Sequence, residues 1–241
     1  MFIAAFAAGI RTKKYGLTLQ DMIFAVPFAG GGIILGGIFL YALVQLPDVI
    51  AHPEVFVQNL PASLQIFGGM VFYGGLFGAV FGLFVYSKVM KQNYGNVLCC
   101  IVPIFPLAHG IMRIGCFAAG CCYGIEHESL GIIFTHSSAA PNGVSLLPVQ
   151  LYEAIFNFII FVIIWQCSKK PKKALSILCL YGLLYAIGRF ALEFLRGDDA
   201  RGRVFTLSTS QFISVLLVIA CISILLLHGF YRNKQKSPLD R

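Results

Sequence analysis

Six long stretches of this chain contain no Asp, Glu, Lys or Arg, and they constrain the fold more than any other feature. They cover residues 22–46, 55–87, 96–112, 154–168, 174–188 and 204–231. A helix needs about 20 apolar residues to cross the hydrocarbon core of a bilayer, within a range of roughly 17–25. Four stretches reach that length, and the other two reach it when a charged residue at one end is included. The pattern therefore predicts membrane-spanning helices, whose backbone polar groups are satisfied internally, instead of a soluble core.

The formal net charge of +8 is distributed in a way that indicates membrane topology and not nucleic-acid binding. Thirteen of the 18 Lys and Arg residues occur in four groups, within residues 11–14, 88–91, 169–173 and 232–241. Two apolar stretches separate each group from the next, and the intervening segments 47–62 and 117–147 contain no Lys or Arg. The positive-inside rule places all four groups in the cytoplasm. We therefore expect the N-terminus outside, the C-terminus in the cytoplasm and no nucleic-acid partner.

The predicted fold is an all-α integral membrane protein of about seven transmembrane helices in one polytopic domain, residues 1–241. Residues 2–10, about 15 Å long as a helix, would be either a truncated first span or a segment lying in the membrane interface. The other spans are expected at residues 22–46, 64–86, 96–116, 148–167, 174–195 and 207–231. A turn at Pro47-Asp48 would end the second span, and Pro103 and Pro106 would kink the fourth.

The five remaining arginines all fall at or beyond the outer ends of the predicted spans, namely Arg113, Arg189, Arg196, Arg201 and Arg203. A guanidinium group presents a planar fork of donors that matches phosphate or carboxylate oxygens. Placing an arginine in a membrane helix costs at least about 2.5–3.5 kcal/mol, so it requires a partner. A phospholipid headgroup is one such partner. We interpret Arg196, Arg201 and Arg203, with the nearby Asp198 and Asp199, as solvated surface charges that pair among themselves.

The predicted sixth span carries Tyr185, Arg189 and Glu193 at intervals of four residues, so the three side chains share one helix face. Glu193 would orient Arg189, and Tyr185 would add a hydroxyl group one turn deeper. This stripe predicts a binding site for an anionic group. The alternative interpretation is a buried ion pair that only holds two helices together.

His109 and Arg113 lie one turn apart near the end of the predicted fourth span. The neighbouring arginine favours His109 as an acid or base, although a lone histidine in a span is often only a helix-to-helix hydrogen bond. Glycines such as Gly115 and Gly124 would let backbone amides approach an anion. The segment also contains Cys116, Cys121 and Cys122, which permit a disulfide of undetermined pairing. Their spacing with His109 matches no familiar zinc pattern, so we predict no metal site.

Two further segments supply candidate substrate-binding residues. Tyr73, Gly74 and Gly75 belong to a glycine-rich part of the predicted third span, which favours either close helix packing or space for an acyl chain. Gln150 and Glu153 begin the predicted fifth span, where Glu153 is a second candidate partner for the arginines.

Taken in order, these motifs resemble the bacterial prolipoprotein diacylglyceryl transferases over nearly the whole chain. The similarity consists of a Gly-Gly-Leu run from Gly74, Arg-Ile-Gly-Cys-Phe from Arg113, Gln-Leu-Tyr-Glu from Gln150, and Arg189 with Glu193 four residues later. The resemblance implies transfer of diacylglycerol from phosphatidylglycerol to the lipobox cysteine of a prolipoprotein. It also implies a multi-pass protein of the bacterial plasma membrane that works without a cofactor, which we expect to be a monomer.

By this resemblance, Arg113 and Arg189 match the family's signature and essential arginines, and Tyr185 and Glu193 match the neighbours of Arg189. The sequence departs from the family pattern at five positions, with Ile38 in place of an arginine, Tyr73 in place of a histidine, Cys116 and Ala119 in place of two asparagines, and Cys121 in place of a glutamate. The expected mechanism is attack by a thiolate, with His109 or, as the alternative, Tyr73 as the base and with Arg113 and Arg189 stabilising the departing phosphate. The alternative is a divergent, non-catalytic or altered-substrate relative that binds anionic lipid or modifies another acceptor.

Overall fold

The computed structural model describes residues 7, 9–51, 72–168, 174–197, 203–204 and 206–235. These residues are mostly helical and form two compact units, residues 2–100 and 101–241, which we call the N-terminal and C-terminal units. Five helical segments in the described chain are long and apolar enough to cross a membrane. They are Leu19–Ala51, Tyr94–Ala118, Val149–Cys167, Ala174–Glu193 and Thr209–Leu227. The predicted class of helical membrane protein is confirmed.

The N-terminal unit contains η1 (Lys13–Tyr15), α2 (Leu19–Ala51), α5 (Phe72–Val89) and most of α6 (Tyr94–Ile101). Helices α2 and α5 pack through glycines on both partners. A Cβ atom added to Gly36 would clash with the backbone of Gly74, and one added to Gly78 would clash with that of Gly32. The close-packing interpretation of this glycine-rich segment therefore holds for Gly74.

Helix α2 corrects one predicted boundary. It includes Pro47 and continues to Ala51, so the turn expected at Pro47-Asp48 is wrong. A proline removes one backbone hydrogen bond, but its fixed φ is compatible with a helix, and near the end of a helix little further structure depends on that bond. The first segments of the predicted first and third spans, residues 2–6 and 64–71, lie outside the described residues.

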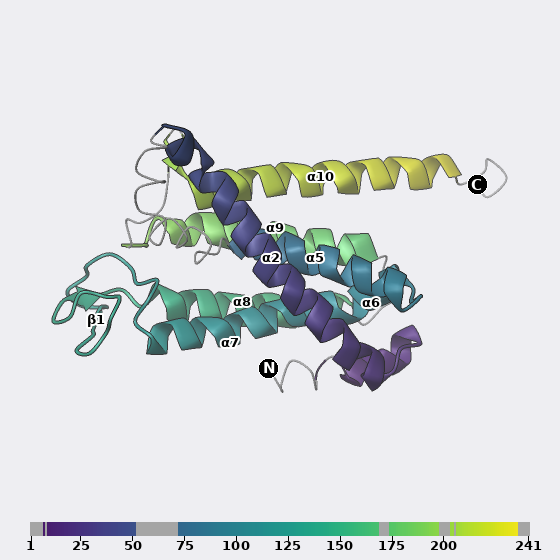
Figure 1. Ribbon diagram of the computed structural model, residues 1–241, viewed down its shortest axis with the longest axis horizontal. Helices are drawn as coiled ribbons and strands as arrows, with labels where there is room; N and C mark the ends of the chain where they lie inside the picture. Colours follow the sequence, from purple (N-terminus) through teal and green to yellow (C-terminus); the bar gives the residue numbers. More distant parts are fainter. Residues whose placement is uncertain are drawn as a thin grey trace. The chain divides into compact units, whose positions relative to one another are not determined.

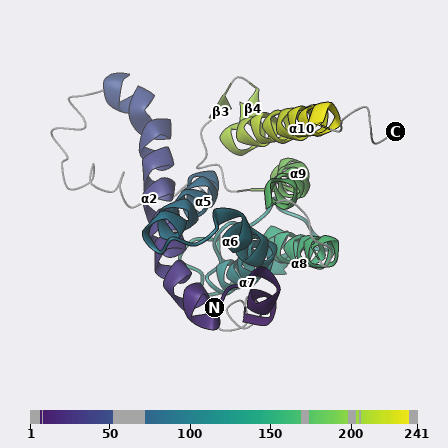
Figure 2. The ribbon, with the colours of Figure 1, turned by 90° about the vertical axis from the view of Figure 1, so that its right-hand side faces the viewer.

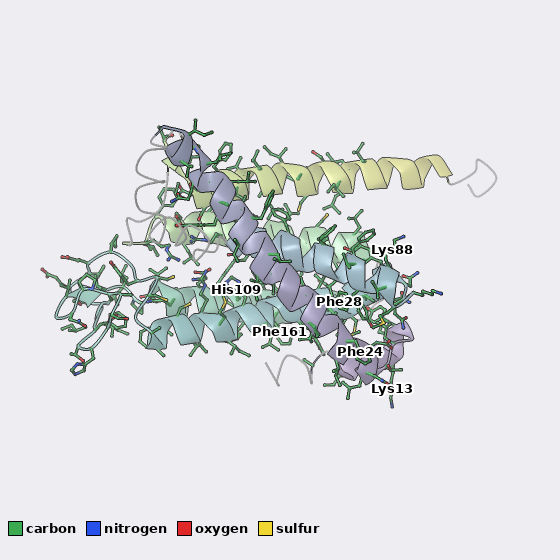
Figure 3. The ribbon with its side chains drawn as sticks, viewed as in Figure 1. Lys13, Phe24, Phe28, Lys88, His109 and Phe161 are labelled. Carbon is green, nitrogen blue, oxygen red and sulfur yellow. The ribbon has the colours of Figure 1, made fainter. Side chains whose placement is uncertain are left out.

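Polar contacts gather at one end of the N-terminal unit. Asp21 accepts hydrogen bonds from the Thr18 backbone N–H (2.8 Å) and from the Gln92 side chain (2.9 Å), which joins the start of α2 to the turn after α5. Figure 3 shows Lys13 and Lys88 at this same end of the unit. Within this unit the two basic groups therefore share one side, as the charge pattern predicts.

The C-terminal unit contains η3 (Val102–Ile104), α7 (Phe105–Ala118), α8 (Val149–Cys167), α9 (Ala174–Glu193) and α10 (Thr209–Gln235). Along this unit α7 contacts α8, α8 contacts α9, and α9 contacts α10, an order that Figure 2 shows end-on. The helix that the sequence places at 96–116 is interrupted by η3, which contains Pro103, and Pro106 stands in the first turn of α7. The expected proline break is thus present.

A long loop, residues 119–148, connects α7 to α8 and lies beyond the ends of these two helices (Figure 1). It contains the short antiparallel pair β1 (Ile132–Ile133) and β2 (Ser145–Leu146). A second short pair, β3 (Arg203–Val204) and β4 (Leu207–Ser208), precedes α10. The α7–α8 loop also pairs Gly124 with Arg196 just after α9, so it joins the ends of three helices.

Candidate active site

The side chain of Glu153 on α8 is the centre of a buried charge cluster in the C-terminal unit. Its carboxylate lies 2.9 Å from Arg113 Nη2, 3.6 Å from His109 Nε2 and 3.7 Å from Arg196 Nη1. Glu153 is 1% exposed and Arg113 is 6% exposed. One carboxylate therefore faces two guanidinium groups, which leaves an excess of positive charge in a place where water does not screen it.

The second pair is formed by Arg189 and Glu193 on α9, whose side chains approach to 2.5 Å one turn apart. Arg189 Nη2 also donates to Ser210 Oγ at 3.1 Å, which links α9 to the start of α10. The other terminal nitrogen, Nη1, is buried and has no hydrogen-bond partner among the described residues. A buried donor without a partner is costly, so Arg189 retains a capacity to bind an anion.

His109 connects the two arginine groups. Arg113 Nε donates a hydrogen bond to His109 Nε2 at 3.1 Å, and the imidazole ring packs against the Tyr185 ring with centroids 5.3 Å apart. Arg113 and Arg189 both act electrostatically on this imidazole. Because Nε2 accepts from a guanidinium, His109 is neutral there and its lone pair is already occupied. Figure 3 labels His109 on α7.

Backbone contacts hold the α7–α8 loop against the end of α9. Gly124 N–H donates to Leu147 C=O at 2.9 Å, and Gly197 N–H donates to Tyr123 C=O at 3.2 Å. A Cβ atom on Gly124 would lie 2.7 Å from the backbone oxygen of Leu195, so this close approach requires glycine. These backbone contacts hold Arg196, which follows α9, next to the carboxylate of Glu153.

An open pocket of about 430 Å³ borders this arrangement. It is lined by residues 123–126, Pro141, Leu146, Arg196 and Gly197. Arg196 thus lies between the pocket and Glu153, and its side chain is only 3% exposed. Gln150, fully buried on α8, donates to Cys121 C=O at 2.7 Å and anchors the first part of the loop.

Three cysteines lie beside the charge cluster. The Sγ atoms of Cys116, Cys121 and Cys122 all lie within 4.8 Å of one another, and none of the three forms a disulfide within the described part of the chain. A hydrogen bond from the Cys116 thiol lowers the pKa of the Cys122 thiol, and the charges of Arg196 and Arg113 lower it further. The arginine charges therefore favour the thiolate form at Cys122, whereas burial raises the pKa of the neighbouring Cys121 thiol.

The structure brings together most of the residues that the sequence singled out. His109, Arg113, Glu153, Tyr185, Arg189 and Glu193 form the cluster described above, and Gln150 and Gly124 hold the loop beside it. No described residue lies within 4 Å of a Cβ atom added to Gly115. Tyr73, Gly74 and Gly75 belong to the N-terminal unit, where Tyr73 is 2% exposed.

Sequence reasoning missed one central residue and two supporting ones. Arg196 was expected among solvated surface charges, but its buried side chain faces Glu153, so that interpretation is wrong. It follows Arg189 by seven residues and therefore continues the stripe of Arg189 and Glu193, a signal that was available. Asn157, one turn after Glu153 and fully buried, and Ser210 were not singled out. The expected partners Asp198, Asp199 and Arg201 lie outside the described residues, as does the side chain of Arg203.

Fold and site together define a helical membrane protein with a buried arginine–carboxylate cluster suited to an anionic group. A model of the prolipoprotein diacylglyceryl transferase family matches residues 1–227, and the chain belongs to this family. It is 39% identical over 227 residues to the phosphatidylglycerol–prolipoprotein diacylglyceryl transferase of Clostridium tetani, covering 92% of this chain and 87% of that protein.

Two other relatives agree. A Clostridium perfringens protein named phosphatidylglycerol–prolipoprotein diacylglyceryl transferase 2 is 41% identical over 192 residues, covering 78% of this chain and 72% of that protein. The similarly named protein of Dehalococcoides mccartyi strain 195 is 31% identical over 231 residues, covering 95% of this chain and 82% of that protein. The resemblance that the motifs indicated is confirmed.

Proposed function

We propose that this protein transfers the diacylglyceryl group of phosphatidylglycerol to the lipobox cysteine of a prolipoprotein. The observation that carries the proposal is the buried cluster in which three arginines face two carboxylates. The arginines are Arg113, Arg189 and Arg196, and the carboxylates are Glu153 and Glu193. An excess of guanidinium groups, with a donor at Arg189 that has no partner among the described residues, matches a phosphate headgroup. Relatives that carry the transferase name over most of the chain favour this activity over the non-catalytic alternative.

In the proposed reaction, the acceptor sulfur attacks the glycerol carbon that bears the phosphate. The S–C bond forms, the C–O bond breaks, and glycerol phosphate leaves with the bonding electrons and takes up a proton. Arg113 and Arg189 stabilise the negative charge that develops on the phosphate. Glu153 and Glu193 keep the two guanidinium groups in position, and Tyr185 packs against the imidazole of His109.

The geometry favours His109 as a positioning residue for Arg113. The nitrogen that would accept a proton already accepts the Arg113 Nε–H at 3.1 Å, so acting as a base would break that contact. Tyr73, Gly75 and Gly115 remain candidate contacts of the lipid, whereas Gly74 packs against Gly36 of α2. Gly124 and Gln150 act by holding the loop that carries the cysteines.

The proposal includes a topology of seven spans in the bacterial plasma membrane, with the N-terminus outside, the C-terminus in the cytoplasm and the site in the outer half. The charge distribution supports this orientation, because the Lys-rich groups alternate with segments free of Lys and Arg. We also propose that the protein folds as one functional domain and works as a monomer.

Complementation tests the function in cells. The gene should restore growth and lipoprotein maturation in a bacterium depleted of its own transferase, and Arg113→Gln and Arg189→Gln should abolish that rescue. Lys88→Gln is the matched control and should complement fully, because it removes an exposed charge in the last turn of α5. Full rescue by either arginine variant would remove that arginine from the mechanism, and failure of the wild-type gene despite normal expression would overturn the proposed activity.

A further inference from the structure

Three thiol groups lie close together at the C-terminal end of α7. Cys121 N–H donates to Cys116 C=O at 3.1 Å and Gly120 N–H donates to Phe117 C=O at 3.0 Å, the hydrogen-bond pair of a Schellman motif. Gly120 adopts the left-handed conformation that this motif requires, with φ of 69°. The motif reverses the chain, so Cys121 and Cys122 return to the helix end that carries Cys116.

Cys122 is also held in a left-handed conformation, with φ of 63°. A residue with a Cβ atom is strained there, at a cost of order 1–3 kcal/mol, and such strain persists only where the surroundings impose it. The consequence here is that all three Sγ atoms lie within 4.8 Å of one another. Two cysteines would suffice for a disulfide, so the third thiol at the same point indicates a different use.

Three convergent thiols form a ligand set for a thiophilic cation. Zn²⁺ binds cysteine sulfur at about 2.3 Å in a tetrahedral arrangement, which places ligand sulfurs about 3.8 Å apart. The three Sγ atoms therefore need to approach by about 1 Å at most. Among the described residues, no further His, Cys, Asp or Glu joins this group. Three protein ligands with an open fourth position are typical of catalytic zinc sites, whereas structural sites are closed by four.

The site lies where the acceptor thiol must react. Cys116 follows Arg113 by three residues on the same face of α7, and Cys122 interacts with the Arg196 guanidinium. These arginines belong to the cluster that we assign to the phosphate. A sulfur held at the cysteine cluster would thus be next to the bond that breaks.

Although the spacing of these residues in sequence predicts no metal site, their convergence in the structure leads us to propose that Cys116, Cys121 and Cys122 bind a Zn²⁺ ion whose open position takes the acceptor cysteine as a thiolate. This inference rests on the proposed transferase function and assigns the activation of the nucleophile to the metal. The acceptor S–H loses its proton to solvent on binding Zn²⁺, because a coordinated thiol is deprotonated. The metal-bound sulfur then attacks the glycerol carbon, the C–O bond to phosphate breaks, and the thioether product dissociates from the ion. No oxidant or reductant is involved.

The arrangement accounts for two features of this sequence. His109 is occupied by Arg113, so the described site needs another means of forming a thiolate. The guanidinium groups of Arg113 and Arg196 offset the net negative charge of three thiolates around a divalent cation.

Metal binding is tested on the full-length protein in detergent, kept reduced and stripped of metal by a chelator. Co²⁺, used as a spectroscopic probe for Zn²⁺, should bind one ion per chain with a thiolate-to-metal charge-transfer band, and added Zn²⁺ should displace it. Cys116→Ser and Cys122→Ser should lose the band, and Cys167→Ser, a half-buried thiol on α8, should keep it. A band unchanged in the cluster variants, or a disulfide among these cysteines that persists under reduction and excludes metal, would overturn the proposal.

The role in catalysis is tested by the pH profile of transfer to a lipobox peptide. The metal-loaded wild type should be active at neutral pH. The stripped enzyme and Cys122→Ser should lose at least about 10-fold at pH 7 and recover toward pH 9, because a free thiol ionises near about 8.5. Equal rates with and without metal at every pH would refute the zinc mechanism and leave the transferase proposal intact. A loaded enzyme that binds Zn²⁺ but transfers nothing at any pH would refute the transferase proposal instead.

Discussion

Replacing Glu153 by Gln is the most informative single substitution, because one carboxylate holds both Arg113 and Arg196. The change removes one negative charge and keeps the shape of the side chain. At an effective dielectric constant of about 20, the attraction is about 5.7 kcal/mol for Arg113 at 2.9 Å and about 4.5 kcal/mol for Arg196 at 3.7 Å. Desolvation offsets much of this, and removing one partner of a buried pair costs about 3–5 kcal/mol net.

We expect Glu153→Gln to lower the thermal midpoint of the detergent-solubilised protein by about 6 °C or more. Without this carboxylate the guanidinium groups of Arg113 and Arg196 should move out of position, which should reduce diacylglyceryl transfer by about 100-fold or more. Glu153→Asp keeps the charge but withdraws it by one methylene, so it should retain more stability than Glu153→Gln. Gln166→Ala, an exposed change on the same helix, is the control. Wild-type activity and stability in Glu153→Gln would refute the reasoning that this carboxylate organises the site.

Three further predictions follow from the glycines and the loop. Gly36→Ala should destabilise the α2–α5 packing by about 1–3 kcal/mol in a thermal or denaturant titration, whereas Gly30→Ala, which meets nothing within 4 Å, should be neutral or stabilising. Gly120→Ala should weaken Co²⁺ binding at the cysteine cluster, because alanine disfavours the left-handed conformation by about 1–2 kcal/mol and its Cβ would clash with Ser137. Gly143→Ala has the same conformational penalty in open space and should leave Co²⁺ binding unchanged, so equal losses in both would contradict this account. Gly124→Ala should reduce transfer by releasing Arg196 from Glu153, and wild-type activity in this variant would show that the loop contact is dispensable.

Five of the expected spans and their order could be predicted from charge-free length alone, because a bilayer sets the length that each span must reach. Side-chain pairs within one helix could also be predicted. Arg189 and Glu193 are four residues apart, and the helix period places them on the same face. Pro47 shows the limit of local rules. Proline disfavours a helix interior, yet α2 continues past this residue to Ala51.

Contacts between helices were harder to predict than contacts within them. Arg196 and Glu153 are 43 positions apart in sequence, and only the folding of the α7–α8 loop against α9 places one over the other. The cysteine cluster depends on the left-handed turn at Gly120, which sequence spacing alone does not reveal. Helix periodicity gives the face of a residue, whereas a loop that reverses the chain must be seen in three dimensions.

The most direct test of the central claim is mass analysis of a lipobox peptide incubated with the purified protein and phosphatidylglycerol. The account predicts a peptide whose cysteine has gained one diacylglyceryl group, formed together with one glycerol phosphate, and no such product with Arg113→Gln. An unmodified peptide after incubation with folded, metal-loaded wild-type protein would contradict it, and so would the same product from the Arg113 variant at the wild-type rate.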